Sequence, residues 1–338
     1  MSNRGSVLIW VIWILTLLAI FTIAINHQVT AELIFGRWMM DRTLTRGFAK
    51  AGVERALYEL QADQFKTFDA LNEDWAANED AFKEIKLGAG DFSVVCNSEQ
   101  GYEESEEGFR YGLCDESARL NINIVPEPVL INFFKAVFPK MESKEMTAIA
   151  EAIIDWRDED DAKLPQGAEA NEYKSLRTPY EPRNGKLESV EELLMVRGVT
   201  PEIYKQMVPY VTVYTDGKVN FNTAPAKVMQ ALGLDEALAA RVIEFRKGGD
   251  GAEGTEDDQV FQDVGNITAS FSVGKSFSSA EYAQIANSIS AGLVVVRSDI
   301  FRIYAIGRLI RGSRTSDELI TCVARRDGKV LYWKEGRS

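Results

Sequence analysis

An uncharged apolar run near the N-terminus is the feature that most restricts how this chain can fold. The run covers residues 7–25 and contains no charge, no Pro and no Gly. At 1.5 Å per residue, an α-helix of this length spans about 28 Å, which is roughly the hydrocarbon core of a bilayer. We therefore expect the chain to be anchored in a membrane through this segment.

Three interpretations of the segment compete. A cleaved secretory signal has an apolar core of about 7–15 residues and then a small-residue cleavage site. This run is longer, and the sequence that follows, NHQVTAELIFGRWMM, has no clear site of that kind. A plain membrane anchor fits the length. In the third interpretation, the chain is cut after Gly5 and the mature protein begins at Ser6. The order of basic head, Gly and apolar run resembles the signal of type IV pilins and type II secretion pseudopilins.

The apolar run continues into an amphipathic pattern. From residue 26 to about residue 60, apolar residues recur at three- and four-residue steps among charged ones, and no Pro interrupts residues 6–60. This pattern predicts one helix of about 55 residues, with its first half in lipid and its second half packed on a globular domain. An anchor followed by a separate soluble helix is the alternative.

Composition excludes several classes of function. The net charge is −13, so there is no basic excess to meet the phosphates of a nucleic acid. The single His, His27, lies at the expected membrane boundary, which nearly excludes a His-based catalytic site or zinc site in the soluble part. We expect a protein that is not an enzyme and does not bind nucleic acid.

Two strand-like runs end in cysteines, DFSVVC at Cys96 and FRYGLC at Cys114. The acidic stretch between them makes a hairpin plausible, and a bridge across it would contribute about 3 kcal/mol in the chain-entropy model. We favour this bridge if the compartment is oxidising, with three free thiols as the alternative. Cys322 would remain unpaired, in a strand.

The order of patterns predicts an α+β fold, in which a long N-terminal helix packs on an antiparallel sheet that is interrupted by a large helical domain. Strand patterns precede residue 124 and return after residue 290, where Asp327-Gly328 signals a hairpin. The expected divisions are a leader at 1–5, the long helix at 6–62 with its transmembrane part at 7–25, a first sheet part at 63–123, the inserted domain at 124–290 and the completing strands at 291–338.

The expected helical domain contains an internal repeat. RLNINIVPEPVL at 119–130 matches KVNFNTAPAKVM at 218–229. The Asn pairs can hydrogen-bond local backbone and cap the following turn, so we interpret both motifs as strand-to-helix junctions. A binding role for the Asn pairs is the alternative.

A helix–Gly–helix pattern at 187–204 resembles DNA-binding helix-hairpin-helix modules. The corresponding hairpin of the second repeat, ALGLDEA, lacks the Gly-x-Gly that would expose backbone N–H groups to phosphate, and its acidic flanks would repel DNA. A membrane-anchored DNA-uptake receptor therefore stays only as the alternative function.

The segment 155–173 gathers seven carboxylates around a Pro-Gln-Gly turn. Asp158, Asp160 and Glu169 occupy positions 1, 3 and 12 of an EF-hand count, and bunched oxygen donors suit Ca²⁺. Position 6 is Lys163 instead of Gly, so a true EF-hand is not expected. A solvated acidic loop is the alternative. The glycine-rich acidic loop at 248–258 is interpreted as a connector.

Together, the Arg-Gly start, LNIN, DWRDEDD, SVEELLMVRGVTPEIY and VNFNTAPAKV resemble the family of general secretion pathway protein K, the large minor pseudopilins of type II secretion. The resemblance implies cleavage after Gly5 and N-methylation of Ser6 by a prepilin peptidase. It also implies a single-pass inner-membrane protein with a periplasmic body. Its expected partners are the smaller minor pseudopilins, in a heterotrimeric tip complex, the major pseudopilin filament and secreted proteins. The family's calcium binding would carry over to Asp158, Asp160, Asp161 and Glu169.

One departure from ordinary pilins concerns the fifth residue of the processed chain. Most pilins and pseudopilins carry Glu there, and its carboxylate neutralises the terminal ammonium of the subunit already in place. If cleavage follows Gly5, this position is Trp10. A topmost subunit has no such amine to meet, and an unpaired charge in hydrocarbon is costly. Trp10 therefore suits a subunit that initiates and caps a pseudopilus, although it could also simply fill lipid space.

Overall fold

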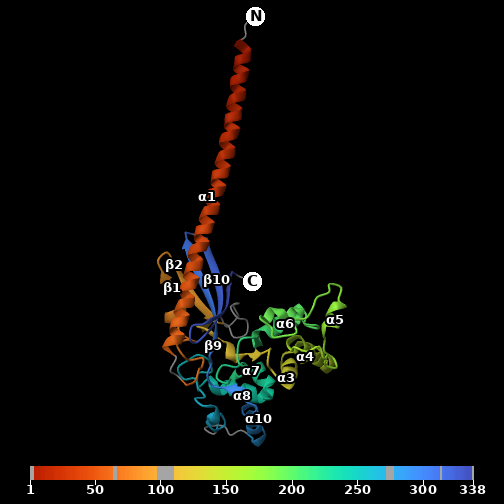
Figure 1. The fold of residues 1–338 in the computed structure, drawn as a ribbon. Helices are drawn as coiled ribbons and strands as arrows, with labels where there is room; N and C mark the ends of the chain where they lie inside the picture. Colours follow the sequence, from red (N-terminus) through yellow and green to blue (C-terminus); the bar gives the residue numbers. More distant parts are fainter. Residues whose placement is uncertain (1–3, 64–66, 97–109, 272–277, 313, 337–338) are drawn as a thin grey trace.

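A single uninterrupted helix dominates the computed structural model, which describes residues 4–63, 67–96, 110–271, 278–312 and 314–336. Helix α1 (Arg4–Ala62) has 59 residues, and its first half projects away from the rest of the molecule (Figure 1). The side chains of residues 7–40 are exposed. Among the described residues, α1 is the one helix that is long and apolar enough to cross a membrane. The prediction of one long helix is confirmed.

The second half of α1 packs on one antiparallel sheet, and we call the two together the sheet body. The strand order is β1-β2-β9-β10-β11, and in addition β3 pairs with β2 and β4 pairs with β9. The strands are β1 (Ile85–Leu87), β2 (Gly90–Cys96), β3 (Arg110–Tyr111), β4 (Cys114–Asp115), β9 (Ile300–Arg311), β10 (Arg314–Arg325) and β11 (Val330–Glu335). Because β2 pairs directly with β9, the early and late strand groups form one sheet, as predicted.

Close approach between α1 and the sheet depends on glycine. A Cβ on Gly307 of β9 would overlap the backbone of Thr45 and Ala49 in α1. A Cβ on Gly52 of α1 would lie 3.1 Å from the side chains of Phe92 and Ala305 in the sheet, which is a tight contact. These contacts let apolar side chains of α1 reach a common core with the strands. That core includes Phe48, Val53, Leu60, Phe92, Phe301, Ile303 and Ile320.

Residues 118–297 form a second unit between β4 and β9, which we call the helical insert. Figure 1 shows it at the end of the molecule farthest from the N-terminus, extending to one side of the sheet. Its core includes Phe133, Phe134, Trp156, Phe221 and Phe261. Its α-helices are α3 (Glu127–Val137), α4 (Ser143–Arg157), α5 (Ala170–Lys174), α6 (Pro201–Met207), α7 (Ala226–Ala231), α8 (Glu236–Arg246), α9 (Ile267–Ser270) and α10 (Ser279–Ser290).

Short parallel strand pairs extend this unit beyond the expected bounds of 124 and 290. Strand β5 (Leu120–Asn121) pairs with β6 (Val211–Thr212), and β7 (Val219–Asn220) pairs with β8 (Val294–Val295). Each pair closes one half of the insert, so the insert consists of two structural repeats. The minor elements are α2 (Glu79–Phe82) in the sheet body and the 3₁₀ helices η1 (Glu116–Ala118), η2 (Val190–Met195), η3 (Val208–Tyr210) and η4 (Val264–Asn266).

The two repeats share a clamp built by an arginine. In the first repeat, Arg157 at the end of α4 donates to the carbonyls of Ile122 and Val125. In the second, Arg246 at the end of α8 donates to the carbonyls of Phe221 and Ala224. The sequence repeat thus corresponds to a duplicated structural unit, in which an arginine binds the Asn-x-Asn loop of its own repeat.

The Asn pairs do more than cap local turns. Asn121 Oδ1 and Asn220 Oδ1 accept from the backbone two residues later, as predicted. The second Asn of each pair instead bonds both the N–H and the C=O of a distant residue. Asn123 binds Leu187 and Asn222 binds Phe261, with distances of 2.7–2.9 Å. The purely local interpretation was incomplete because it did not include these long-range bonds.

Candidate metal site

The loop between α4 and α5 brings carboxylates from its two ends together. Asp158 is the C-cap of α4, and Glu169 is the N-cap of α5. One carboxylate oxygen from each of Asp158, Asp160 and Glu169 lies within 4.8 Å of the others. The turn before Glu169 needs a glycine, because a Cβ on Gly167 would overlap the carboxylate of Asp155. Local chain geometry therefore aims three predicted ligands at one point.

Two of these three carboxylates have buried oxygens without partners, whereas Asp160 is exposed and its Oδ1 accepts from the N–H of Ala162 at 2.7 Å. Both carboxylate oxygens of Glu169 and Oδ1 of Asp158 are buried without a hydrogen-bond partner in the described structure. Burial, together with the neighbouring carboxylates of Asp155 and Asp158, raises the pKa of Glu169 to about 7. Burial also raises the pKa of Asp158. Buried oxygens of like charge without donors are what a divalent cation would satisfy.

Two further acidic residues of the loop, Asp155 and Asp161, accept hydrogen bonds from the protein. Asp161 lies outside the converging group, and its Oδ1 accepts from Asn184 Nδ2 at 2.9 Å. Asn184 Oδ1 is buried without a partner, so this amide offers a further neutral oxygen next to the loop. Sequence reasoning missed Asn184 because it follows Glu169 by 15 residues and belongs to no ligand spacing. Asp155 accepts from the backbone N–H of Leu164.

The glycine-rich acidic loop occupies the equivalent place in the second repeat, but its charges are satisfied internally. Asp257 Oδ2 accepts from the backbone N–H of Gly249 at 2.6 Å and of Asp250 at 3.1 Å. Glu253 pairs with the clamp arginine, Arg246. This loop contributes to no converging carboxylate group within the described part of the chain.

A third acidic group lies in the sheet body, where oxygens of Asp63, Asp69 and Glu73 come within 4.8 Å of one another. Arg326 already supplies a cation there, since its guanidinium binds both Asp63, at 3.1 Å, and Asp69. Charge compensation therefore singles out the loop of Asp158, Asp160 and Glu169 as the candidate metal site.

The disulfide that the sequence favours is present in the structure. Cys96 at the end of β2 is bonded to Cys114 at the start of β4, with 5.4 Å between the Cα atoms. The connecting residues 97–109 lie outside the described residues. Cys322 is a buried free thiol whose pKa is raised to about 12 by burial, so it stays protonated. The disulfide therefore ties β2 to β4.

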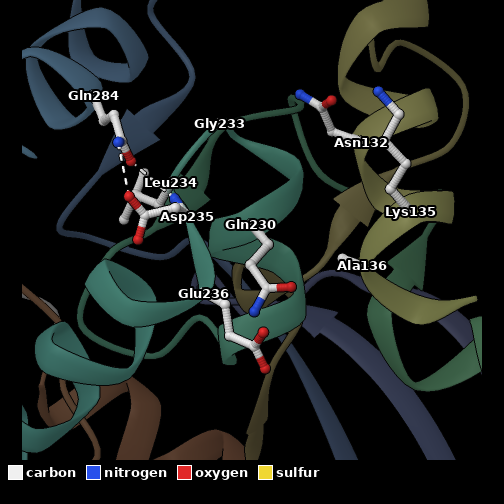
Figure 2. Close-up of a pocket in the computed structure, with 9 residues that line it drawn as sticks. All are labelled: Asn132, Lys135, Ala136, Gln230, Gly233, Leu234, Asp235, Glu236 and Gln284. Carbon is white, nitrogen blue, oxygen red and sulfur yellow. Dashed lines mark hydrogen bonds between the residues drawn. The ribbon is translucent and has the colours of Figure 1, made fainter. Parts of the chain in front are cut away.

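A surface hollow of about 410 Å³ lies at the helix hairpin of the second repeat. Figure 2 shows Asn132 and Lys135 of α3 on one side of it and Asp235 bonded to Gln284 on the other. Asp235 also accepts from the N–H of Leu238 at the start of α8. These bonds lower the pKa of Asp235, and the bond from Gln284 has the largest effect. A carboxylate thus occupies the helix N-terminus that a DNA phosphate would need.

The sequence comparisons point to one kind of protein. The family model for type II secretion system (T2SS), protein K, matches residues 118–216, which cover the first repeat. The type II secretion system protein K of Aeromonas hydrophila is 32% identical over 135 residues, 36% of this chain and 41% of that protein. The protein K of Klebsiella pneumoniae is 24% identical over 225 residues, 65% of this chain and 66% of that protein. The matches thus span less than two thirds of these relatives' length.

The fold has a counterpart among solved structures. A chain in the crystal structure of the GspK-GspI-GspJ complex from the enterotoxigenic Escherichia coli type 2 secretion system matches with a TM-score of 0.65 and 17% identity. The match covers 90% of this chain and 99% of that chain. In its fold, its matched first repeat and its related sequences, the chain is similar to the type II secretion system protein K family.

Proposed function

We propose that this protein is a minor pseudopilin that initiates a type II secretion pseudopilus and stays at its tip, where it supports protein export across the outer membrane. The observation that carries the proposal is the combination of an exposed apolar helix with a sheet body and a bulky insert at the far end. The apolar half of α1 would lie in the bacterial inner membrane, and the body would lie in the periplasm.

Two features favour the tip over a place within the filament. The insert projects from the end of the molecule opposite the N-terminus and would obstruct a further subunit stacked there (Figure 1). After cleavage following Gly5, the fifth residue would be Trp10, which offers no carboxylate to the amine of another subunit. A topmost subunit needs neither an upper neighbour nor such a carboxylate.

The expected partners are the smaller minor pseudopilins, because the structurally similar chain was solved together with GspI and GspJ. The full-length protein, co-expressed with its two smaller minor pseudopilins and purified in detergent, should elute with them as one complex in light-scattering chromatography. Separate elution of all three would overturn the assembly proposal. Mass spectrometry should find a methylated Ser6 at the N-terminus, whereas an intact Met1 would contradict processing.

Calcium is the cofactor that we propose for the acidic loop. Asp158, Asp160 and Glu169 would hold the ion, with Asn184 as a neutral oxygen donor beside them. The fit rests on the buried carboxylate oxygens that have no donors and on the absence of a cation from their immediate contacts among the described residues. A bound Ca²⁺ would supply the missing positive charge and connect the end of α4 to the start of α5.

This role for the ion is structural. The clamp of Arg157 fixes the end of α4 on the Asn-x-Asn loop, and the ion would fix the start of α5 relative to it. Removing calcium should therefore lower the melting temperature of the protein. Unchanged melting after chelation, with no calcium detected by elemental analysis of the purified protein, would refute the site.

A further inference from the structure

We propose that two consecutive residues, Asp115 and Glu116, form a joint that holds the helical insert in one orientation on the sheet body. The insert would then be a rigid extension of the body instead of a domain on a flexible tether. The proposal deepens the tip function above, because only an insert held in place can obstruct a further subunit.

Connectivity alone would allow the insert to swing. The chain enters it after β4 and leaves it just before β9. These two crossings lie side by side, since Cys114 pairs with Arg302 and Asp115 pairs with Phe301. Two adjacent crossings define a hinge, so a fixed orientation requires contacts beyond the backbone connections.

Asp115 supplies such contacts to the second repeat. Its Oδ2 accepts from Thr223 Oγ1 at 2.6 Å and from Asn220 Nδ2 at 3.2 Å, both in the insert. The same oxygen accepts from Ser298 Oγ at 2.6 Å, at the exit from the insert. Asp115 is only 5% exposed, so these bonds form away from water. The side chain thus joins both crossings to the second repeat.

Glu116 performs the same task for the first repeat. Its fully buried carboxylate accepts from Thr212 Oγ1 of β6. It also pairs with Arg302 of β9 and lies 3.6 Å from Arg119 in an ion pair. One carboxylate therefore connects the first repeat to the central strand of the sheet. Neighbouring residues in the chain thus hold one repeat each.

The sheet body completes the joint through Asp69. Asp69 Oδ2 accepts from the N–H of Ser298 at 2.6 Å, and its carbonyl accepts from Asn220 Nδ2 at 3.1 Å. Arg326 binds the Asp69 carboxylate and the Ser298 carbonyl. Rotating the insert would break these bonds and leave buried charges without their partners, which is strongly unfavourable.

Comparison of the repeats indicates that this use of Asn220 is special. Its counterpart Asn121 directs its amide N–H to the carbonyl of Thr215, inside the insert. Asn220 directs the equivalent group to Asp69, Asp115 and Ser298, across the boundary. The same position of a duplicated unit therefore closes one repeat on itself and attaches the other to the body.

The test measures the orientation directly in the full-length protein in detergent. Spin labels on Tyr58→Cys in α1 and Lys205→Cys in α6, both exposed positions, report the distance from body to insert by double electron–electron resonance. The labelled protein with native Asp115 and Glu116 should give one narrow distribution of distances between the labels. The double substitution Asp115→Asn with Glu116→Gln should broaden it at least twofold. Asp216→Asn, an exposed change within the insert, should leave it narrow.

A milder variant covers the case in which the double variant fails to fold. Thr223→Val removes one donor to Asp115 from the insert side, and it should also broaden the distribution while the circular dichroism of the protein stays native. A broad distribution with the native joint, or an unchanged width in the folded variants, would overturn the proposal. Because the measurement uses the isolated protein, it is independent of tip assembly. The joint variants could show a broadened distance distribution and still bind the smaller minor pseudopilins. That result would support the joint but count against the need for a rigid insert at the tip.

Discussion

Replacement of Glu169 by Gln separates the effect of charge from that of shape at the candidate calcium site. The pKa of Glu169 is about 7, against an ordinary value of 4.5, because of burial and then its acidic neighbours. The raised pKa means that the folded protein loses stability as the pH rises from 4.5 through 7, when this group must ionise. The penalty is complete above about pH 8 in the absence of a cation.

The size of this penalty follows from the shift in pKa. At 1.36 kcal/mol per unit, the difference corresponds to about 3 kcal/mol, and screening by water at the loop surface reduces it to about 2 kcal/mol. Glu169→Gln keeps the shape of the side chain and removes the charge. In a chelator at pH 8, it should therefore raise the stability of the insert by about 2 kcal/mol, or roughly 4–8 °C in melting temperature.

Calcium should stabilise the parent protein much more than the Glu169→Gln variant. With Glu169 intact, calcium at about 100 times its dissociation constant adds about 2.7 kcal/mol of stability. Glu169→Gln should lose most of this gain. Differential scanning calorimetry with calcium and with chelator compares the four states. Glu256→Gln, an exposed change in the equivalent loop of the second repeat, is the matched control and should keep the full gain.

Two results would refute this reasoning. A chelated Glu169→Gln protein that melts below the chelated parent would show that the carboxylate stabilises the loop without an ion. A full calcium gain in Glu169→Gln would place the ion elsewhere.

Further predictions concern pH, the disulfide and helix packing. Calcium affinity measured by titration calorimetry should fall at least tenfold between pH 8 and pH 6, because protons compete for Glu169, and an equal affinity would contradict this. Paired Cys96→Ser and Cys114→Ser changes should lower the free energy of unfolding in urea by about 3 kcal/mol, and an unchanged midpoint would argue against a structural bridge. Gly307→Val should detach α1 from β9 and lower the melting temperature by several degrees, since the added atoms overlap α1. Gly36→Ala, where nothing lies within 4 Å, should instead stabilise the helix by up to about 1 kcal/mol, and a loss in circular dichroism would contradict it.

Much of the fold could be read from local patterns in the sequence. The apolar run, its amphipathic continuation and the absence of Pro determine α1, because helix formation depends on residues three and four positions apart. The hairpin at Asp327-Gly328 follows from the backbone freedom of Gly328, whose φ is +86°. Ligand spacing in the acidic loop predicted that Asp158, Asp160 and Glu169 lie together, as they do, because the loop is short enough for local geometry to decide. It also included Asp161, which lies outside the group.

Tertiary structure decided how the charges are used. Nothing in the spacing of either acidic loop shows that one has unpaired carboxylates while the other pairs Glu253 with Arg246. Asn184 and the joint of Asp115 and Glu116 escaped sequence reasoning for the same reason. Their partners come from segments far apart in the chain, such as Asn220 and Ser298 for Asp115. The sequence by itself determined the long apolar helix, the order of the main elements and the repeat. Only packing showed which acidic groups find partners from distant segments and which, at the candidate ion site, are left without them.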